Sequence, residues 1–161
     1  MNKIISSEDL SNKIQSLKNK KKKIVLCHGV FDIIHAGHIS HFKSAKKFGD
    51  ILIVSVTSDK YVNKGFNRPM FELNKRKKIL SELNIIDYVC DSDSQDAISI
   101  IEKIKPNFYC KGPDYKKFDN DITNKIKKEI KILKKFGGKF KVTEDQTFSS
   151  SKIINLLNKG N

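Results

Sequence analysis

The sequence is poor in several features that would each indicate a particular class of protein. Its three cysteines, Cys27, Cys90 and Cys110, are an odd number, and none lies in a CxxC spacing. We therefore expect reduced thiols in a cytoplasmic protein and not a disulfide framework. No apolar run approaches the roughly 18 residues that a membrane span requires. The first residues lead into a polar helical pattern and not into a signal peptide, so we expect no membrane partner.

Arginine is also scarce, although the chain is strongly basic. The net charge is +14, yet of 32 lysines and arginines only Arg68 and Arg76 are arginines. Proteins that recognise phosphates and bases specifically favour arginine, because its planar guanidinium group makes bidentate contacts. The lysines here are also not accompanied by an aromatic-rich nucleic-acid-binding motif. We interpret the charge mainly as compositional bias with solvated lysine faces. A functional interpretation also stays open, in which the positive field gathers small polyanionic substrates. A basic nucleic-acid-binding module is the remote alternative, and it predicts steeply salt-dependent binding to DNA or RNA.

What the chain does have is enough length and apolar content for one domain with a substantial core. It has 161 residues, of which 38% are hydrophobic and 31% charged. We expect an N-terminal helix with a lysine-rich lead-in over residues 1–22 and a main domain over residues 23–161. We find no internal repeat and no low-complexity linker.

Short apolar, β-branched runs alternate with helical patterns along the main domain. Strands are expected over residues 24–27, 51–56, 87–90, 108–110 and 139–142. Helices are expected after a cap at Ser6 or Ser7, over 36–48, over 71–83, from a cap at Asp93 or Ser94 to Ile104, along the apolar face of Ile122, Ile126, Ile130 and Leu133, and over 150–158. This alternation predicts an α/β, Rossmann-like fold with a five-stranded parallel sheet and helices on both faces. Such sheets bind ligands at the carboxyl ends of their strands, near the point where the strand order reverses.

The loop after the first expected strand carries the strongest chemical signal. It contains neither GxGxxG nor GxxxxGK[ST], so the usual dinucleotide and P-loop motifs are absent. His35 and His38 flank Gly37 where the next helix begins. Unpaired N–H groups at a helix start attract anions, and the glycine lets a phosphate approach the backbone closely. Two imidazoles there would suit the stabilisation of charge on a phosphorus centre during displacement.

Two other interpretations of the histidines stay open. His28, His35, His38 and His41 lie close together in the sequence with Cys27 beside them. This group would suit a zinc site, although its spacing matches no strong zinc pattern. Alternatively, the histidines are simply satisfied at the start of a helix. The residues leave open whether His28 and His41 have any role.

Longer stretches of the chain resemble the nucleotidyltransferase superfamily over residues 8–157. The segments that carry the resemblance are Gly29-Val30-Phe31-Asp32 with His35-Ala36-Gly37-His38, similar to the HxGH signature; Lys111-Gly112-Pro113-Asp114-Tyr115, similar to the KGxDY segment of heptose-phosphate adenylyltransferases; and Phe148-Ser149-Ser150-Ser151-Lys152-Ile153-Ile154, similar to their STTxII motif and to ISTTKI of glycerol-phosphate cytidylyltransferases. Arg68-Pro69 and Arg76 match arginines that follow the second strand in these families. Cys27-His28 stands where the heptose type has Thr-Asn, which leaves the nucleotide and the sugar open.

The resemblance implies a reaction and a set of partners. A nucleoside monophosphate would pass from a nucleoside triphosphate, with ATP favoured, to a phosphorylated sugar similar to heptose 1-phosphate, and pyrophosphate would leave. The product would serve the synthesis of activated sugars or surface polysaccharides. CTP with glycerol 3-phosphate or another alcohol phosphate is the alternative. Mg²⁺ would be bound mainly through the triphosphate, with no protein ligand assigned, and relatives of this type are often homodimers.

The resemblance also implies roles for individual residues. The implied catalytic residues are His35, His38, Lys43 and Arg76. The implied nucleotide-binding residues are Gly29, Val30, Phe31, Asp32, Gly37, Lys111, Gly112, Asp114, Ser149, Ser150 and Ser151. The implied residues for the second substrate are Asp59, Lys64 and Arg68.

Overall fold

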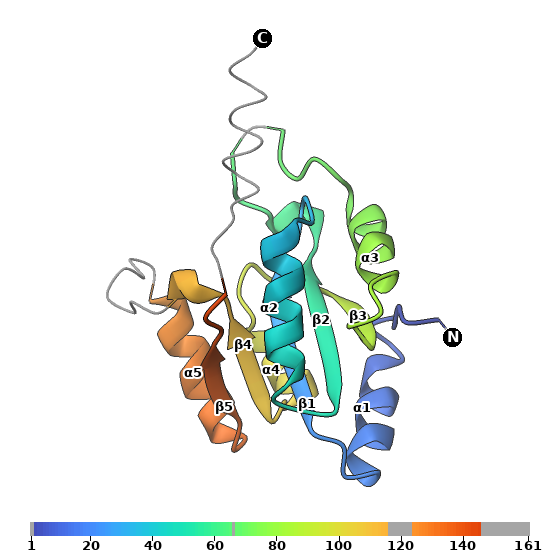
Figure 1. Cartoon of the computed structure of the whole chain (residues 1–161), viewed down its shortest axis with the longest axis vertical. Helices are drawn as coiled ribbons and strands as arrows, with labels where there is room; N and C mark the ends of the chain where they lie inside the picture. Colours follow the sequence, from blue (N-terminus) through green and yellow to red (C-terminus); the bar gives the residue numbers. More distant parts are fainter. Residues whose placement is uncertain (1, 66, 116–123, 146–161) are drawn as a thin grey trace.

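Five parallel strands form a single sheet in the computed structural model of the chain, which describes residues 2–65, 67–115 and 124–145 (Figure 1). The strands are β1 (Ile24–Gly29), β2 (Ile51–Thr57), β3 (Tyr88–Ser92), β4 (Phe108–Lys111) and β5 (Lys139–Val142), in the order β3-β2-β1-β4-β5. The described helices are α1 (Leu10–Asn19), α2 (Ala36–Lys46), α3 (Leu73–Ser81), α4 (Ile98–Ile104) and α5 (Lys125–Lys135), with short 3-10 turns η1 (Asp59–Tyr61) and η2 (Pro113–Tyr115). The predicted Rossmann-like fold is confirmed.

Helices cover both faces of the sheet, which explains why its central strands are apolar throughout. Ile24 and Leu26 of β1 join a core with α1, α4 and α5, whereas Val25 and Cys27 join a second core with α2 and α3. Figure 1 shows α2 in front of the sheet and α4 behind it. In register, Cys27 lies between Val54 of β2 and Cys110 of β4. The middle of the sheet is therefore rigid, and its strand ends are fixed points for a site.

The N-terminal segment shares the core of the main domain. The N–H of Ile5 donates to the carbonyl of Val89 at 2.9 Å, and the N–H of Val89 donates to the carbonyl of Lys3, so residues 3–5 run along the edge of β3. Leu10 and Ile14 of α1 are buried in the same core as β1, where α1 packs against α4. The segment thus covers one edge of the sheet, where unpaired strand groups would otherwise be exposed.

Most boundaries lie within a few residues of those predicted, but two helices begin after their expected caps. Helix α1, expected from a cap at Ser6 or Ser7, begins at Leu10 with Asp9 as its N-cap. The helix expected from Asp93 or Ser94 begins only at Ile98. The Asp93 carboxylate accepts instead from the Ser58 hydroxyl at 2.8 Å, and the Asp96 carboxylate accepts the Ile98 N–H at 3.0 Å. Because of this tertiary contact, Asp93 does not cap α4. The helix predicted over 150–158 and the apolar position Ile122 lie outside the described residues.

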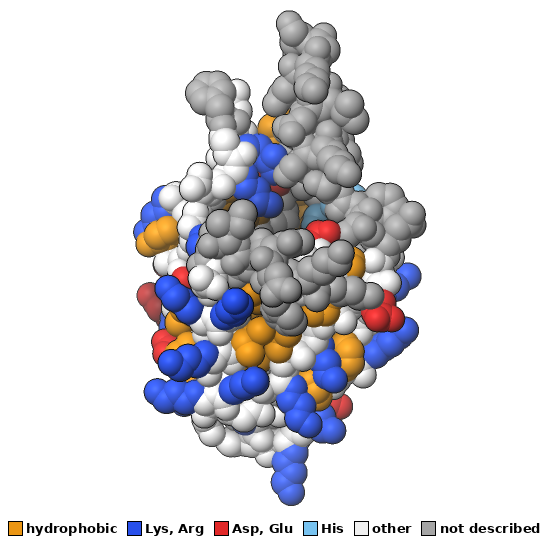
Figure 2. All heavy atoms as spheres, turned by 90° about the vertical axis from the view of Figure 1, so that its left-hand side faces the viewer, with side chains coloured by type: hydrophobic (Ala, Val, Ile, Leu, Met, Phe, Trp, Pro, Cys, Tyr) orange, Lys and Arg blue, Asp and Glu red, His pale blue; other side chains and the backbone are white. Residues whose placement is uncertain are grey.

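Lysines are dispersed over the surface of α5 and β5. Figure 2 shows them on this face among apolar and neutral side chains. Lys127, Lys131 and Lys134 are exposed, while Ile126 and Leu133 on the opposite side of α5 are buried. This arrangement agrees with solvated lysine faces on amphipathic helices. None of the described helices has the length and apolarity to cross a bilayer.

Candidate active site

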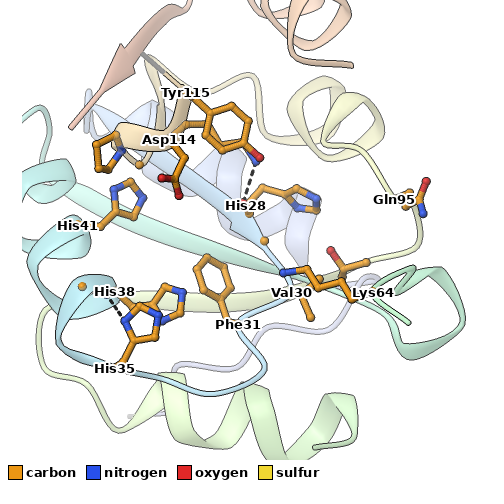
Figure 3. Close-up of a pocket in the computed structure, with 16 residues that line it drawn as sticks. His28, Val30, Phe31, His35, His38, His41, Lys64, Gln95, Asp114 and Tyr115 are labelled. Carbon is orange, nitrogen blue, oxygen red and sulfur yellow. Dashed lines mark hydrogen bonds between the residues drawn. The ribbon is translucent and has the colours of Figure 1, made fainter. Parts of the chain in front are cut away.

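A cavity of about 350 Å³ opens at the carboxyl ends of β1 and β4, where the strand order reverses (Figure 3). This is the position predicted for a ligand site in such a sheet. The predicted site residues that line it are Gly29, Val30, Phe31, His35, Gly37, His38, Lys64, Lys111, Gly112 and Asp114. The cavity is also lined by residues for which we predicted no role from the sequence, namely His28, His41, Thr57, Gln95, Pro113 and Tyr115.

The N-terminus of α2 forms one wall, and His35 caps it. His35 has an extended backbone, and its Nδ1 accepts the backbone N–H of His38 at 3.4 Å. Its ring stacks on that of His38, with centroids 3.8 Å apart and planes inclined by 22°. The first N–H groups of a helix attract anions, and Gly37 in the first turn of α2 lines the cavity together with the two rings.

His38 keeps a ring nitrogen available for a ligand. Its Nδ1 is buried and has no hydrogen-bond partner among the described residues. Burial, aided by the nearby His35, His41 and Lys64, lowers the pKa of His38 to about 3. The imidazole is therefore neutral at pH 7. A buried polar atom without a partner costs stability, which is the signature expected of a group that meets its partner in a bound ligand.

Phe31 and Gly29 set the position of His38. Phe31 has φ of +51°, a conformation that is strained for a residue with a side chain. Its ring turns back over the end of β1, so a Cβ on Gly29 would lie 3.1 Å from the Phe31 ring. The same ring packs edge-on against His38 at 5.4 Å and against Phe42 at 5.3 Å. The glycine thus allows an aromatic side chain to support the imidazole.

Two ammonium groups face the cavity from other elements. Lys111 Nζ donates to the carbonyl of His28 at 3.1 Å and lies 5.0 Å from the centroid of the Tyr115 ring. Burial lowers the pKa of Lys64, as do the charges of Arg68 and Lys111, against the opposing effect of Asp32. Asp114 is the one carboxylate among the described lining residues. The cavity is therefore built for an anion.

Arg76, which is predicted to bind phosphate, is held by hydrogen bonds within the protein. Its side chain is fully buried and donates to the carbonyls of Phe71 and Thr57, both at 2.8 Å, to the carbonyl of Val30, and to Asp59 Oδ1 at 2.6 Å. Four hydrogen bonds thus use most of its five N–H donors. A buried guanidinium needs such partners, and these contacts hold the cavity wall, while the phosphate-binding role implied for Arg76 stays a prediction.

Asp59, predicted to bind the second substrate, also serves this wall. Its second oxygen, Oδ2, accepts the N–H of Leu73 at the start of α3. With Arg76 on the other oxygen, the carboxylate connects η1 to α3. It is not among the described residues that line the cavity.

Asp32 and Arg68 form a buried pair behind the cavity and are likewise absent from its lining. Asp32 accepts from Arg68 Nε at 2.7 Å and from the N–H groups of Met70 and Phe71. Burial raises the pKa of Asp32, but these hydrogen bonds outweigh it and hold the pKa below its ordinary value. Arg68 Nη2 is buried without a partner in the described part of the chain. The pair fixes the loop that carries Lys64.

Lys43, predicted to be catalytic, is exposed on α2 and lies outside the described lining of the cavity. The structure thus places it away from the two histidines, on another face of the same helix. The predicted residues Ser149, Ser150 and Ser151 lie outside the described residues.

The two histidines whose roles the sequence left open both line the cavity. Nδ1 of His28 lies 2.9 Å from the Ser55 hydroxyl, and Nδ1 of His41 lies 2.8 Å from the Thr143 hydroxyl. Burial, with the charge of Lys111, lowers the pKa of His28 to about 3. For His41, a signal was present in the sequence, since it follows His38 at a helical spacing of three.

The four imidazoles do not form the zinc site considered from the sequence. Nδ1 of His28 and of His41 turn to different hydroxyls, while His35 and His38 stack on each other. Among the residues that the structure describes, no group of three or more His, Cys, Asp or Glu side chains is arranged to hold a metal ion.

A family model for cytidylyltransferase-like proteins matches residues 26–156, which include most of β1, the HxGH segment and the residues that line the cavity. The chain belongs to this family. The resemblance to nucleotidyltransferases seen in the sequence is thereby confirmed.

Individual relatives in the cytidylyltransferase-like family agree with this. The bifunctional protein HldE of Blochmanniella pennsylvanica is 37% identical over 161 residues, which cover 98% of this chain and 32% of the relative. HldE of Campylobacter concisus is 39% identical over 139 residues, which cover 85% of this chain and 29% of the relative. The chain thus spans about a third of the length of these curated relatives.

Two solved structures share the fold. A lipopolysaccharide core biosynthesis protein from Thermoplasma volcanium has a TM-score of 0.62 and 28% identity, covering 80% of this chain and 99% of that one. A pantoate–β-alanine ligase from Francisella tularensis has a TM-score of 0.54 and 20% identity, covering 94% of this chain and 72% of that one. The second supports the fold only.

Proposed function

We propose that this chain transfers a nucleoside monophosphate from a nucleoside triphosphate, ATP by preference, to a phosphorylated sugar similar to heptose 1-phosphate. The observation that carries the proposal is the cavity at the β1–β4 switch point, where the α2 N-terminus, two neutral imidazoles and two lysines converge. These groups are suited to a polyphosphate, whose charge is spread over several oxygens. The products would be a nucleotide-activated sugar and pyrophosphate.

The chemistry is one displacement at phosphorus. An oxygen of the acceptor phosphate forms a bond to the α-phosphorus, and the bond between that phosphorus and the bridging oxygen to the β-phosphate breaks. The electron pair leaves with pyrophosphate. Because the acceptor phosphate is already ionised, no general base and no covalent intermediate on the protein are needed. The rate enhancement then comes from alignment and from charge stabilisation.

The cavity residues would bind different parts of the triphosphate according to their positions. His35, His38 and the N–H groups around Gly37 would hold the reacting phosphate at the start of α2. Lys111 and Lys64, which both line the cavity, would neutralise the remaining phosphate charge. Neutral imidazoles suit this position, because each keeps one N–H to donate as negative charge develops on the phosphate oxygens.

The donor set of the cavity fits Mg²⁺ that arrives with the triphosphate. Mg²⁺ typically combines one or two carboxylates with waters and substrate phosphates, and Asp114 supplies one carboxylate in the described lining. When bound, the ion would offset phosphate charge and favour departure of pyrophosphate.

Similarity to named proteins supports the choice of acceptor. The matched relatives are named as a bifunctional protein HldE, and one structural neighbour is named for lipopolysaccharide core biosynthesis. With the KGxDY resemblance at Lys111, these favour a heptose-like phosphate over glycerol 3-phosphate, and hence a role in surface polysaccharide synthesis.

A panel of substrates tests the proposal. Purified protein is mixed with Mg²⁺, each of ATP, CTP, GTP and UTP, and heptose 1-phosphate or glycerol 3-phosphate, and pyrophosphate release is followed. We expect the highest kcat/KM with ATP and heptose 1-phosphate. A preference for CTP with glycerol 3-phosphate would replace the substrates but keep the reaction. No release in any combination, from folded protein, would contradict the reaction itself.

The homodimer suggested by the resemblance remains a proposal as well. Sedimentation equilibrium of the purified chain at micromolar concentration should give twice the monomer mass of 18.4 kDa. A single species of monomer mass would contradict it.

A further inference from the structure

We propose that His41 is a third phosphate-binding imidazole of this cavity, positioned by Thr143, and that it binds the phosphates beyond the one held at the start of α2. This inference rests on the proposed function, since it requires a nucleoside triphosphate in the cavity. It assigns a role to a histidine that the HxGH segment does not include.

The place of His41 on α2 directs it to the cavity. Residues three apart lie on the same side of a helix, so His41 continues the surface that His35 and His38 begin. All three line the cavity. Figure 3 shows the His41 ring further along α2 than the rings of His35 and His38. A chain of phosphates that starts at the helix N-terminus and runs along α2 therefore meets this ring.

One nitrogen of His41 is occupied and the other remains for a ligand. Nδ1 lies 2.8 Å from Thr143 Oγ1. Thr143 is itself buried and fixed, because its N–H donates to the Lys111 carbonyl at 3.0 Å. The two nitrogens of an imidazole point to different sides of the ring, so this contact leaves Nε2 as the atom that can meet substrate. The His41 residue is only 9% exposed, so its ring has little freedom to turn away.

Charged groups of both signs surround His41, and Lys111 is the one that can attract a phosphate. Lys111 faces the ring from β4, while Asp114 lies on η2 and His38 on α2 itself. After β5, Asp145 also acts on His41, and its Oδ2 is buried without a partner in the described part of the chain. When the Thr143 hydroxyl donates to Nδ1, the neutral ring carries its N–H on Nε2. An anion that accepts from this N–H and from the Lys111 ammonium would be bound on two sides.

Two amide substitutions separate binding by Nε2 from the contact made by Nδ1. In His41→Asn, the short amide can replace Nδ1 toward Thr143 but does not reach the position of Nε2. In His41→Gln, the longer amide can place a donor near Nε2. The dissociation constants of Mg-ATP and of AMP are measured by titration calorimetry, because AMP lacks the outer phosphates.

We expect His41→Asn to weaken Mg-ATP roughly tenfold or more, the scale of one hydrogen bond to a charged group, and to weaken AMP less than threefold. His41→Gln should stay within threefold of the wild type for both ligands. Thr143→Val should weaken Mg-ATP several-fold, because the ring loses its orientation. Ser44→Ala is the matched control. Ser44 lies on α2 like His41, and its hydroxyl donates to Asp145, but it is outside the described cavity lining. The affinity of Ser44→Ala for ATP should not change.

Wild-type affinity for Mg-ATP in folded His41→Asn would overturn the inference, and so would equal losses for ATP and AMP, which indicate a structural tether only. If both amide variants fail to fold, Thr143→Val decides, and unchanged ATP affinity in that variant overturns the proposal. The proposed function is judged separately on the wild type: if the wild type releases pyrophosphate while His41→Asn binds ATP normally, only the role of His41 is lost.

Discussion

On α2, the imidazole of His38 is neutral and keeps a ring nitrogen without a partner in the described chain. On α3, the guanidinium of Arg76 is permanently charged and donates to four protein oxygens. Both residues match family motifs as phosphate ligands. The difference follows from charge: a guanidinium cannot lose its proton, so burying it demands partners from the protein. An imidazole can be buried in its neutral form, which allows one of its nitrogens to have no protein partner until substrate binds. The His38 region is thus a binding surface, and the Arg76 region is scaffold.

The largest expected effect comes from removing the scaffold. Arg76→Met leaves buried carbonyls and Asp59 without their donor, and we expect the free energy of unfolding to fall by about 3–5 kcal/mol. Urea denaturation measures this. Lys75→Met, at an exposed position of the same helix, should change it by less than about 0.5 kcal/mol. The contrast between the two regions breaks down if Arg76→Met keeps its stability and loses only nucleotide affinity.

Substitution of His35 or His38 should lower the reaction rate and leave the stability of the fold nearly unchanged. His35→Ala and His38→Ala should each lower kcat by roughly a hundredfold or more, the scale seen when one transition-state donor is removed. Single-turnover measurements with saturating ATP and sugar phosphate report the chemical step, and circular dichroism confirms the fold. Unchanged turnover in both variants would refute the assigned role.

Acid should weaken the fold through the neutral imidazoles. The pKa values of His28 and His38 are lowered to about 3 and that of His41 to about 4, while an unfolded histidine titrates near 6.5. Between these values the unfolded chain binds more protons, so stability is full above pH 6.5 and is lost as the pH falls toward 4. We expect a loss of at least about 2 kcal/mol between pH 7 and pH 5 in urea titrations. A flat profile over that range would show that these rings are not buried in neutral form.

The smallest expected effect compares two faces of α2, the one with the cavity-lining histidines and the exposed one with Lys43. Lys43 is exposed on this helix, outside the described lining of the cavity. Lys43→Ala should therefore change kcat/KM by less than about twofold at physiological salt, since exposed charges are screened there. A tenfold loss would restore the catalytic role that the resemblance implies for this residue.

Motifs predicted which side chains gather at the cavity better than they predicted what each one does. Gly29, His35, His38 and Lys111 line it because they follow or precede strands of one parallel sheet, and the carboxyl ends of such strands meet at one edge. Arg76 matched its motif equally well, but its neighbours in space, not in sequence, occupy its donors.

The predicted helix boundary at Asp93 was wrong for a related reason. A good capping residue predicts a helix start only if its carboxylate is free, and Asp93 accepts instead from Ser58, 35 residues away. Local propensity carries no information about a partner at that distance in the sequence.

The sequence by itself determined the alternation of strands and helices, the Rossmann-like class and the histidine pair around Gly37, because hydrophobic period and short motifs are local properties of a chain. Only the tertiary structure decided which charged groups are scaffold and which face a ligand, and that His41 joins the cavity through Thr143, 102 residues later. Burial and hydrogen-bond partners depend on contacts between distant segments, and these exist only once the sheet has assembled.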